Sequence, residues 1–351
     1  MVMPCGDLDV RAVRALALLT KGATFTVAHV HRSTQPTLHR EVIARAPTRI
    51  DLGGGWTDVP PYCDREGGFV CSLAITRYAL ARVTDAGGAP PVGQNPILRA
   101  ALRRSGTNGV NVHLTNDFPT GAGLGGSSSA SAAILGALSV WNGRAIDRVA
   151  IAEEGRRIEV EELGVAGGRQ DHYAATHGGA LALTFTTGVA VQRIPLGAAT
   201  RRELLASCTL IYTGESRVSG ETINAVLDAY GAGEPRVLDA LCRMREVASD
   251  MATALAAGDI NALGELIGEH WFHQRGLHPT IPTPKIDQIV AAASTAGALG
   301  AKAMGASGGG CVLIMSRASR TAEVRNAVRG LGEFIDFDID ETGLTIVSEN
   351  A

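Results

Sequence analysis

The most informative stretch of the chain is P-T-G-A-G-L-G-G-S-S-S-A, residues 119–130. It holds four glycines and three consecutive serines, and the small-residue run S-A-A-I-L-G-A-L follows it. Glycines permit a tight turn and a close approach to a ligand because they have no Cβ. The Ser and Ala run predicts a packed helix, whose first free N–H groups would favour an anion. The stretch therefore predicts a phosphate-binding loop at the start of a helix.

Two common nucleotide-binding patterns fit this loop poorly. The dinucleotide fingerprint requires G-x-G-x-x-G directly after the first strand of a βαβ unit, with an acidic residue about 20 positions further on. The segment Gly121-Ala-Gly-Leu-Gly125 matches it imperfectly, and no suitable acid follows. The Walker loop requires G-K-[ST], and this loop has no lysine. A tight turn before a buried helix is the purely structural alternative.

The composition is that of a globular protein without a polyanionic partner. The chain has 351 residues, 45% hydrophobic and 19% charged, which is enough for two domains of ordinary size. Its formal net charge of −3 gives no sign of a surface for nucleic acid or anionic membrane. The six cysteines form no C-x-x-C pair, and no apolar run approaches the roughly 18 residues of a membrane span. We therefore expect a cytoplasmic protein with free thiols and no resident disulfide. The oligomeric state stays open.

Strand-like and helix-like segments alternate without regular βαβ order, which favours the α+β class. Residues 1–40 form an N-terminal extension without a metal-ligand pattern. A boundary near residue 200 divides the remainder into domains of residues 41–200 and 201–351. Strands are expected at residues 42–47, 48–52, 69–75, 78–83, 111–115, 181–185, 190–194, 208–212, 311–315 and 334–347. Helices are expected at residues 129–141, 147–163 and 286–298 and, by apolar spacing, within 220–268.

The loop pattern P-x-x-x-G-L-x-x-S-S resembles the phosphate loop of the GHMP family of small-molecule kinases. Two further motifs of that family lie in the right order, A-P-T-R-I-D-L-G-G-G-W-T-D at residues 46–58 and G-A-S-G-G-G-C at residues 305–311. The resemblance covers residues 41–351. It implies an N-terminal domain with a left-handed βαβ unit, a C-terminal ferredoxin-like domain, and a site between them.

The resemblance also implies ATP as the phosphoryl donor, bound by the residues of the loop. These are Pro119, Gly121, Gly123, Leu124, Gly125, Gly126, Ser127, Ser128 and Ser129. Two positions depart from the family pattern. Gly126 stands where many relatives have the first serine, so the metal-binding serine is expected to be Ser127, with Ser128 as the alternative. Ser307 replaces a glycine that is usual in the last motif.

Phosphoryl transfer requires Mg²⁺ on the phosphates and a group that orients or deprotonates the attacking hydroxyl. By resemblance, Glu159 and Ser127 would hold the Mg²⁺, and Asp171 would face the acceptor hydroxyl. Arg49 would stabilise charge near the attacking oxygen. Hard oxygen ligands suit Mg²⁺. The structural alternatives are a solvated helix face for Glu159, a turn cap for Asp171 and an ordinary strand-end arginine for Arg49.

The first motif carries the substrate hint, because G-G-W-T-D-x-P-P-Y is similar to the branch that phosphorylates the anomeric hydroxyl of sugars. Its members include kinases of L-fucose and of D-glycero-D-manno-heptose 7-phosphate. Asp58 would accept hydrogen bonds from sugar hydroxyls, and Trp56 would stack on a ring face or simply fill the core. Further candidates for contact with the acceptor are Gly55, Thr57 and Gly308. A phosphorylated acceptor would need a basic clamp, for which Arg217 and Arg169 are candidates.

The leading hypothesis is an ATP-dependent sugar 1-kinase, with the heptose 7-phosphate preferred over L-fucose, another free sugar or a cyclitol. A second hypothesis is a catalytically inactive sugar sensor on the same fold. The presence of Ser127, Glu159 and Asp171 favours the enzyme. A third is a decarboxylase or isoprenoid kinase of this fold, which the G-G-W-T-D motif disfavours.

Overall fold

The computed structural model describes residues 40–87, 95–215 and 220–350. The N-terminal extension expected at residues 1–40 therefore lies almost wholly outside the described residues, as does Arg217. Within the described ranges no helix combines the length and the apolar character that crossing a membrane requires.

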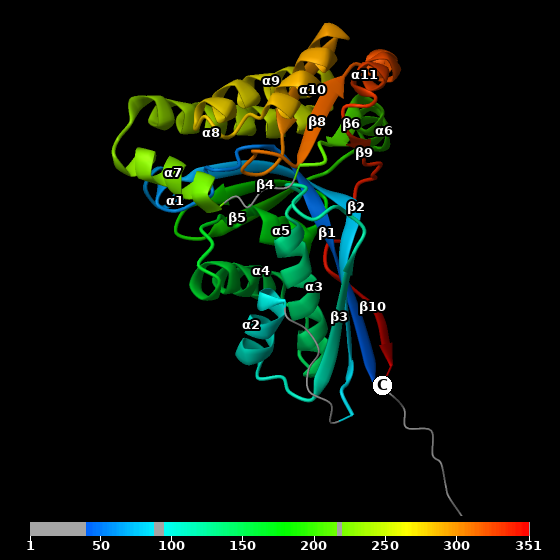
Figure 1. Ribbon diagram of the computed structural model, residues 1–351. Helices are drawn as coiled ribbons and strands as arrows, with labels where there is room; N and C mark the ends of the chain where they lie inside the picture. Colours follow the sequence, from blue (N-terminus) through cyan, green and yellow to red (C-terminus); the bar gives the residue numbers. More distant parts are fainter. Residues whose placement is uncertain (1–39, 88–94, 216–219, 351) are drawn as a thin grey trace, which may run out of the picture. The chain divides into compact units, whose positions relative to one another are not determined.

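The first sheet is antiparallel, and its strands come from both ends of the described chain (Figure 1). Its order is β10-β1-β2-β4-β5, with β3 also paired to the long strand β2. The strands are β1 (Glu41–Gly53), β2 (Gly68–Asp85), β3 (Val110–Asn116), β4 (Ala180–Phe185), β5 (Val189–Ile194) and β10 (Thr345–Asn350). Strand β10 thus returns from the end of the chain to lie beside β1. The domain boundary expected near residue 200 stays a prediction.

Helices with small side chains pack closely on this sheet. Helix α3 (Gly126–Trp141) contacts β1 and β2, and its residues 128–138 are all buried. Beside it lie α2 (Pro96–Ser105), α4 (Arg148–Arg157) and α5 (Gln170–His177). The run of Ser and Ala lets the helix approach the sheet, because it has few long side chains to accommodate. The alanine-rich core formed in this way fixes the helix start that carries the glycine loop.

The second sheet has the order β7-β8-β6-β9 and is also antiparallel. Its strands are β6 (Cys208–Tyr212), β7 (Ala298–Ala303), β8 (Cys311–Ser316) and β9 (Glu333–Phe334). Its helices are α6 (Ala198–Ser207), α7 (Gly220–Gly231), α8 (Pro235–Ala257), α9 (Ile260–Gly276), α10 (Pro284–Thr295) and α11 (Thr321–Val328). Ile50 and Leu73 of the first sheet share one apolar cluster with Met251 of α8, Ile267 of α9 and Leu313 of β8. This shared core joins the end of β1 to the second sheet.

Several predicted boundaries were wrong. Pro47 does not end a strand: β1 continues through it, because the register shifts between Pro47 and Thr48 and a bulge tolerates a missing N–H. The two strands expected at residues 69–75 and 78–83 are the single strand β2. The alternating segment 334–347 forms strand only at its two ends. The expected helix at 147–163 changes at Ile158 into a π-helix, Ile158–Glu162.

Candidate active site

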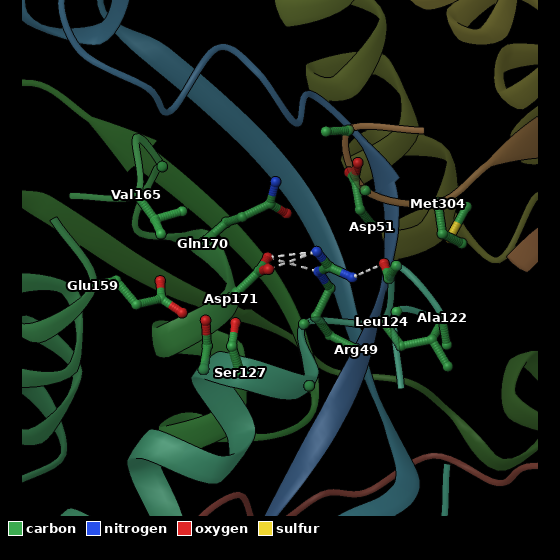
Figure 2. A pocket seen from close by; sticks show the side chains of 18 of the residues that line it. Arg49, Asp51, Ala122, Leu124, Ser127, Glu159, Val165, Gln170, Asp171 and Met304 are labelled. Atoms are coloured by element: carbon green, nitrogen blue, oxygen red, sulfur yellow. Dashed lines mark hydrogen bonds and ion pairs between the residues drawn. The ribbon is translucent and has the colours of Figure 1, made fainter. Parts of the chain in front are cut away.

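A cavity of about 490 Å³ lies where the three glycine motifs meet (Figure 2). The glycine loop, the end of β1, the loop before α5 and the loop between β7 and β8 all line it. Its wall includes Arg49, Asp51, Gly55, Trp56, Asp58, Pro119, Gly121, Gly123, Leu124, Gly125, Gly126, Ser127, Ser128, Glu159, Gln170, Asp171, Met304 and Ser307. The sequence motifs predicted to cooperate are therefore neighbours in space.

The glycine loop packs against the last motif through backbone contacts. Gly123 has a φ of 74°, and a Cβ there would lie 2.7 Å from the carbonyl oxygen of Met304. The amide of Cys311 donates to the carbonyl of Ala122 at 2.8 Å. Only glycine fits such a close approach with a positive φ. The two motifs thus hold each other's conformation.

The three serines of the loop have different surroundings, because α3 begins at Gly126 rather than near residue 129 as expected. Ser129 is buried, and its hydroxyl donates to the carbonyl of Ala46 at 2.6 Å. Ser128 is also buried, 3.4 Å from the His172 ring nitrogen Nε2. Ser127 is exposed to the cavity, and its hydroxyl lies beside Glu159 and helps to lower the pKa of that carboxyl group (Figure 2). Ser127 is therefore the loop serine positioned to meet a ligand.

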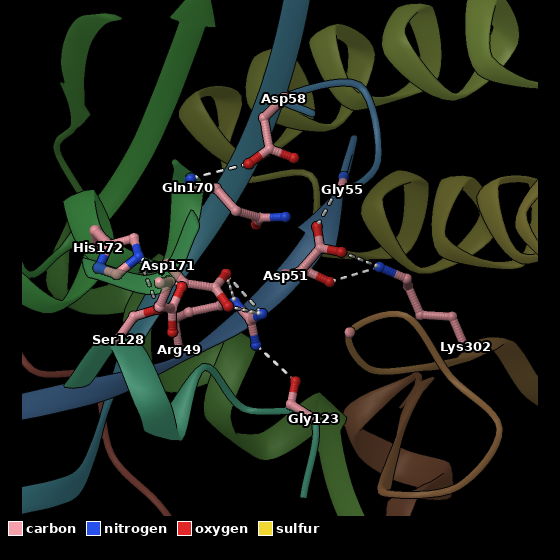
Figure 3. A network of polar contacts seen from close by, with 12 residues as sticks. Arg49, Asp51, Gly55, Asp58, Gly123, Ser128, Gln170, Asp171, His172 and Lys302 are labelled. Carbon is pink, nitrogen blue, oxygen red and sulfur yellow. Dashed lines mark hydrogen bonds and ion pairs between the residues drawn. The ribbon is translucent and has the colours of Figure 1, made fainter. Parts of the chain in front are cut away.

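Arg49 and Asp171 form a bidentate ion pair in the middle of the cavity wall (Figures 2 and 3). Arg49 Nε lies 2.7 Å from Asp171 Oδ1, and Nη2 lies 2.7 Å from Oδ2. The third nitrogen, Nη1, donates to the carbonyl of Gly123 at 2.7 Å. The Arg49 side chain is 4% exposed and that of Asp171 27%. A rigid guanidinium thus fixes the carboxylate against the glycine loop while one side of it faces the cavity.

Asp171 lies in the first turn of helix α5, not in the turn expected after Gly167-Gly168. Its carboxylate occupies space that a side chain on the loop would need, since a Cβ at Gly125 would lie 3.1 Å from Asp171 Oδ2. Gly125 has a φ of 71° and precedes the first residue of α3. The starts of α3 and α5 therefore meet at this carboxylate.

Glu159 sits in the π-helix at the end of α4, and its carboxylate points toward Ser127 (Figure 2). Nε2 of the buried His172 lies 2.9 Å from Glu159 Oε2. Burial raises the pKa of Glu159, but the His172 ring and the Ser127 hydroxyl outweigh it, so that the net shift is downward. The carboxylate is ionised at neutral pH. The predicted alternative of a solvated helix face does not describe this residue, whose side chain is 15% exposed.

Asp58 is almost completely buried at the other end of the cavity, where it accepts a hydrogen bond from the backbone N–H of Gln170 at 2.9 Å (Figure 3). Burial raises its pKa to about 6, despite this hydrogen bond. A Cβ at Gly168 would lie 1.8 Å from Asp58 Oδ2, so the loop approaches closely only because it has no side chain there. An ionised or half-ionised carboxylate with little solvent is a strong acceptor for hydroxyl groups.

Two residues predicted to contact the acceptor are engaged elsewhere. The Thr57 hydroxyl donates to the Gly54 carbonyl at 2.7 Å and accepts from the Phe69 amide at 3.2 Å. The Gly308 amide donates to the carbonyl of Ile281 at 2.8 Å. Neither residue lines the cavity, whereas Gly55, Trp56 and Asp58 do. Thr57 instead holds the turn that carries its neighbours.

Several buried polar atoms beside the acceptor motif have no hydrogen-bond partner in the described chain. They are Nε1 of Trp56, Oε1 of Gln170 and Oγ of Ser307, and all three residues line the cavity. Trp56 and Ser307 also have positive φ values of 82° and 72°, which non-glycine residues rarely adopt. Unpaired buried polar groups and backbone strain are both costly, and they concentrate where a ligand compensates for them.

Sequence reasoning missed a second buried ion pair behind the first motif. Lys302 of β7 donates to the Asp51 carboxylate at 3.0 Å and to the Asp51 carbonyl at 2.7 Å (Figure 3). The amide of Gly54 donates to Nε2 of His270 at 2.8 Å. Burial keeps the pKa of His270 well below its usual value, so the ring is neutral. Residues of the second sheet and of α9 thus position the first motif.

The basic clamp expected for a phosphorylated acceptor is not assembled by the described residues. Arg169 lies 3.4 Å from Glu153 and does not line the cavity. Arg217 lies outside the described residues. Among those described, Arg49 is the only lysine or arginine on the cavity wall, and Asp171 pairs with it.

The donor set fits Mg²⁺ carried by a nucleotide better than a resident ion. Within the described ranges no three His, Cys, Asp or Glu side chains gather to hold a metal by themselves. One carboxylate, Glu159, and one hydroxyl, Ser127, face the cavity together. Mg²⁺ commonly takes one or two carboxylates and completes its shell with phosphate oxygens and water.

The profile of the GHMP kinases N terminal domain matches residues 95–179, and that of the GHMP kinases C terminal matches residues 251–333. D-glycero-alpha-D-manno-heptose 7-phosphate kinase of Campylobacter jejuni is 24% identical over 335 residues, covering 87% of this chain and 98% of the relative. L-fucokinase/L-fucose-1-P guanylyltransferase of Bacteroides fragilis is 26% identical, covering 87% of this chain and 38% of the relative.

The fold has a solved counterpart in a D-glycero-D-manno-heptose 1-phosphate kinase from Bacteroides thetaiotaomicron. The two share 22% identity with a TM-score of 0.71, covering 88% of this chain and 99% of that one. Both family domains occur in the expected order, and the two sheets match the two-domain architecture. The chain therefore belongs to the GHMP kinase family and is a phosphotransferase with that family's two-domain fold.

Proposed function

We propose that the protein is an ATP-dependent sugar kinase that phosphorylates the anomeric hydroxyl, with D-glycero-D-manno-heptose 7-phosphate as the first candidate acceptor. The observation that carries the proposal is the Arg49–Asp171 pair, which faces the cavity directly beside the glycine loop. The C. jejuni relative, which aligns over most of both chains, supports the choice of acceptor.

The donor would bind at the start of α3. Free amides of the first turn and the glycine-rich backbone would hold the phosphates, since a helix N-terminus favours anions. Ser127 and Glu159 would hold Mg²⁺, which neutralises charge on the β and γ phosphates when it is bound. Glu159 is ionised in the absence of nucleotide. It can therefore take part in binding without first losing a proton.

The unpaired polar atoms support a polyhydroxylated acceptor. Trp56 Nε1 is a donor, Gln170 Oε1 an acceptor and Ser307 Oγ both, and Asp58 adds a buried carboxylate. Leaving such groups unpaired costs about 1–3 kcal/mol each. A sugar ring offers hydroxyls of both polarities and would recover part of this cost on binding. An isoprenoid acceptor would leave most of these groups without partners.

Asp171 would orient the acceptor hydroxyl toward the γ-phosphorus and take up its proton. Both carboxylate oxygens bind Arg49, but each keeps a free lone pair for a hydroxyl. The acceptor oxygen forms the new bond to phosphorus while the bond to the β-phosphate oxygen breaks, and ADP leaves. Arg49 would hold Asp171 in place and balance negative charge near the attacking oxygen.

A coupled ADP-release assay with ATP and Mg²⁺ tests the proposal on a panel containing the heptose 7-phosphate, L-fucose, galactose, mannose, uronic acids and cyclitols. The expected product is a sugar 1-phosphate, recognised by ³¹P NMR coupling to the anomeric proton. A protein that phosphorylates mevalonate but none of the sugars would contradict the proposed sugar-kinase activity. Sugar and ATP binding without any product would indicate a sensor instead.

A free sugar such as L-fucose is the second candidate acceptor. Asp51, Asp58 and Asp171 line the cavity, and the one cation on its described wall is already paired. This arrangement favours an acceptor without a phosphate group. The kinetic preference within the panel distinguishes the two, and Arg217→Ala separates them further. Loss of activity toward the heptose 7-phosphate, with L-fucose turnover unchanged, would identify Arg217 as the missing clamp.

A further inference from the structure

We propose that His172 is a positioning residue, which orients the Glu159 carboxylate toward the metal that accompanies the nucleotide. This inference rests on the proposed function of the site. His172 directly follows Asp171 in the sequence.

The contact between the two side chains is short and almost enclosed. His172 Nε2 lies 2.9 Å from Glu159 Oε2, and the His172 side chain is 2% exposed. A carboxylate offers only acceptor oxygens, so the hydrogen of this contact belongs to the ring nitrogen. A charge-assisted hydrogen bond of this kind holds the carboxylate in one orientation.

The ring has little room to leave this position. Ser128 Oγ lies 3.4 Å from the same nitrogen on the side of α3. On the side of α4, a Cβ at Gly155 would lie 2.8 Å from the ring atom Nδ1. Gly155 is buried and precedes Glu159 by four residues. Helix α4, which leads into the π-helix with Glu159, therefore also forms the wall against which the ring packs.

The support matters because Glu159 sits in irregular helix. Glu159 belongs to the π-helix Ile158–Glu162, which follows α4. His172 holds the carboxylate from α5, while Ser127 lies beside it at the start of α3 (Figure 2). Side chains that hydrogen-bond metal ligands commonly contribute 10–100-fold to metal affinity.

The same short helix would thus serve both halves of the reaction. Asp171 points to Arg49 and the cavity, and His172 points to Glu159, because successive residues of a helix differ by about 100° in direction. A displacement of α5 would move Asp171, the proposed base, and would also shift the His172 ring that supports Glu159, the proposed metal ligand. This coupling distinguishes His172 from a residue that only fills the core.

The test compares His172→Phe with His172→Gln in the full-length protein. Calorimetry measures ADP affinity with Mg²⁺ and with EDTA, and Mn²⁺ binding is followed by electron paramagnetic resonance in the presence of ADP. For His172→Phe we expect metal-dependent ADP binding to weaken about 10-fold or more, with metal-free ADP affinity unchanged. His172→Gln retains an N–H donor and should restore most of the metal affinity.

His177→Gln is the matched control, since His177 lies on the same helix and stacks on Tyr173, with ring centroids 5.5 Å apart, instead of contacting Glu159. It should leave the metal dependence unchanged. Equal losses with and without metal, together with a lowered melting temperature, would show that His172 is only structural. Unchanged Mn²⁺ binding by a folded His172→Phe would also overturn the proposal. If the wild type binds no ADP under either condition, the proposed function fails first.

Discussion

The ammonium group of Lys302 lies 3.0 Å from the carboxylate of Asp51, with the two side chains 0% and 2% exposed. Lys302 belongs to β7 of the second sheet, and Asp51 lies near the end of strand β1 of the first sheet. Burial alone would raise the pKa of Asp51, but the charges of Lys302 and Arg49 and the hydrogen bond from Lys302 lower it overall. Burial lowers the pKa of Lys302, and the Asp51 carboxylate opposes that shift. The contact ties the two sheets together behind the cavity.

Removal of the lysine should destabilise the protein. In Lys302→Met the Asp51 charge stays buried without its partner, and breaking a buried pair in this way costs about 3–5 kcal/mol. Urea unfolding measures the loss. Lys285→Met, at a partly exposed site in α10, is the control and should change stability little. The additional change Asp51→Asn should recover part of the loss, and a single mutant as stable as the wild type would contradict the importance of the pair.

Asp171→Asn should fold normally and lose most turnover. Asparagine keeps the shape of the side chain but cannot take up the proton of the acceptor hydroxyl, and loss of a general base typically costs 10²–10⁴-fold in rate. The coupled ADP-release assay gives kcat, and calorimetry gives ATP affinity, which should change little. Asp250→Asn, exposed on α8, is the matched control. Near-normal turnover in Asp171→Asn would refute the assigned role.

Asp58→Asn should stabilise the protein at neutral pH and weaken acceptor binding. Asp58 has a pKa of about 6 in the folded protein and an ordinary value of 3.8, so the folded state holds its proton more tightly. The native state therefore loses stability relative to the unfolded state as the pH rises from about 4 to 6, and the full loss persists above 6. Removing the charge should recover up to ~3 kcal/mol at pH 7.5 and little near pH 4.

Thermal unfolding across this pH range checks the stability change, and acceptor KM checks the function. Wild-type KM for the acceptor should rise as the pH falls below about 6, because a protonated Asp58 accepts hydrogen bonds more weakly. A pH-independent difference between Asp58→Asn and the wild type would contradict the raised pKa.

Two serines separated by one residue should give opposite phenotypes. Ser127→Ala should lower the affinity for Mg²⁺-ATP and leave stability nearly unchanged, since this side chain is exposed to the cavity. Ser129→Ala should destabilise the fold by about 1–3 kcal/mol, because its buried hydroxyl donates to Ala46. Mg²⁺ titrations of turnover and urea unfolding separate the two effects. Equal loss of stability in both variants would contradict this division.

The parts of the site that depend on local chain geometry could be predicted from the sequence. The glycine loop at the start of a helix could be predicted from its own residues, because such patterns are encoded over a few positions. Arg49 and Asp171 are 122 positions apart, and their proximity was implied only by the resemblance to the family. Predicted boundaries failed where tertiary structure overrode the local signal. Pro47 is tolerated at a bulge, and Asp171 lies in the first turn of a helix that starts soon after two glycines typical of a turn.

The supporting residues could not have been predicted in the same way. Lys302 meets Asp51 across 251 positions in the chain, and His270 meets Gly54 across 216. No spacing rule relates residues so far apart. The contact between His172 and Glu159 spans only 13 positions, but it depends on the change from α-helix to π-helix just before Glu159. Helical periodicity alone gave a single helix over that region.

The π-helix at Ile158–Glu162 makes the direction of Glu159 depend on the number of residues in the chain as well as on their identity. A π-turn accommodates one residue more than an α-turn. Deletion of Val160 would therefore keep every residue proposed to bind the metal or the nucleotide. The segment could then form a regular α-helix instead of a π-helix. Comparisons of related chains should thus count residues between Gly155 and Asp171 before they equate two glutamates. A gap of one position there would change which side chain the nucleotide meets.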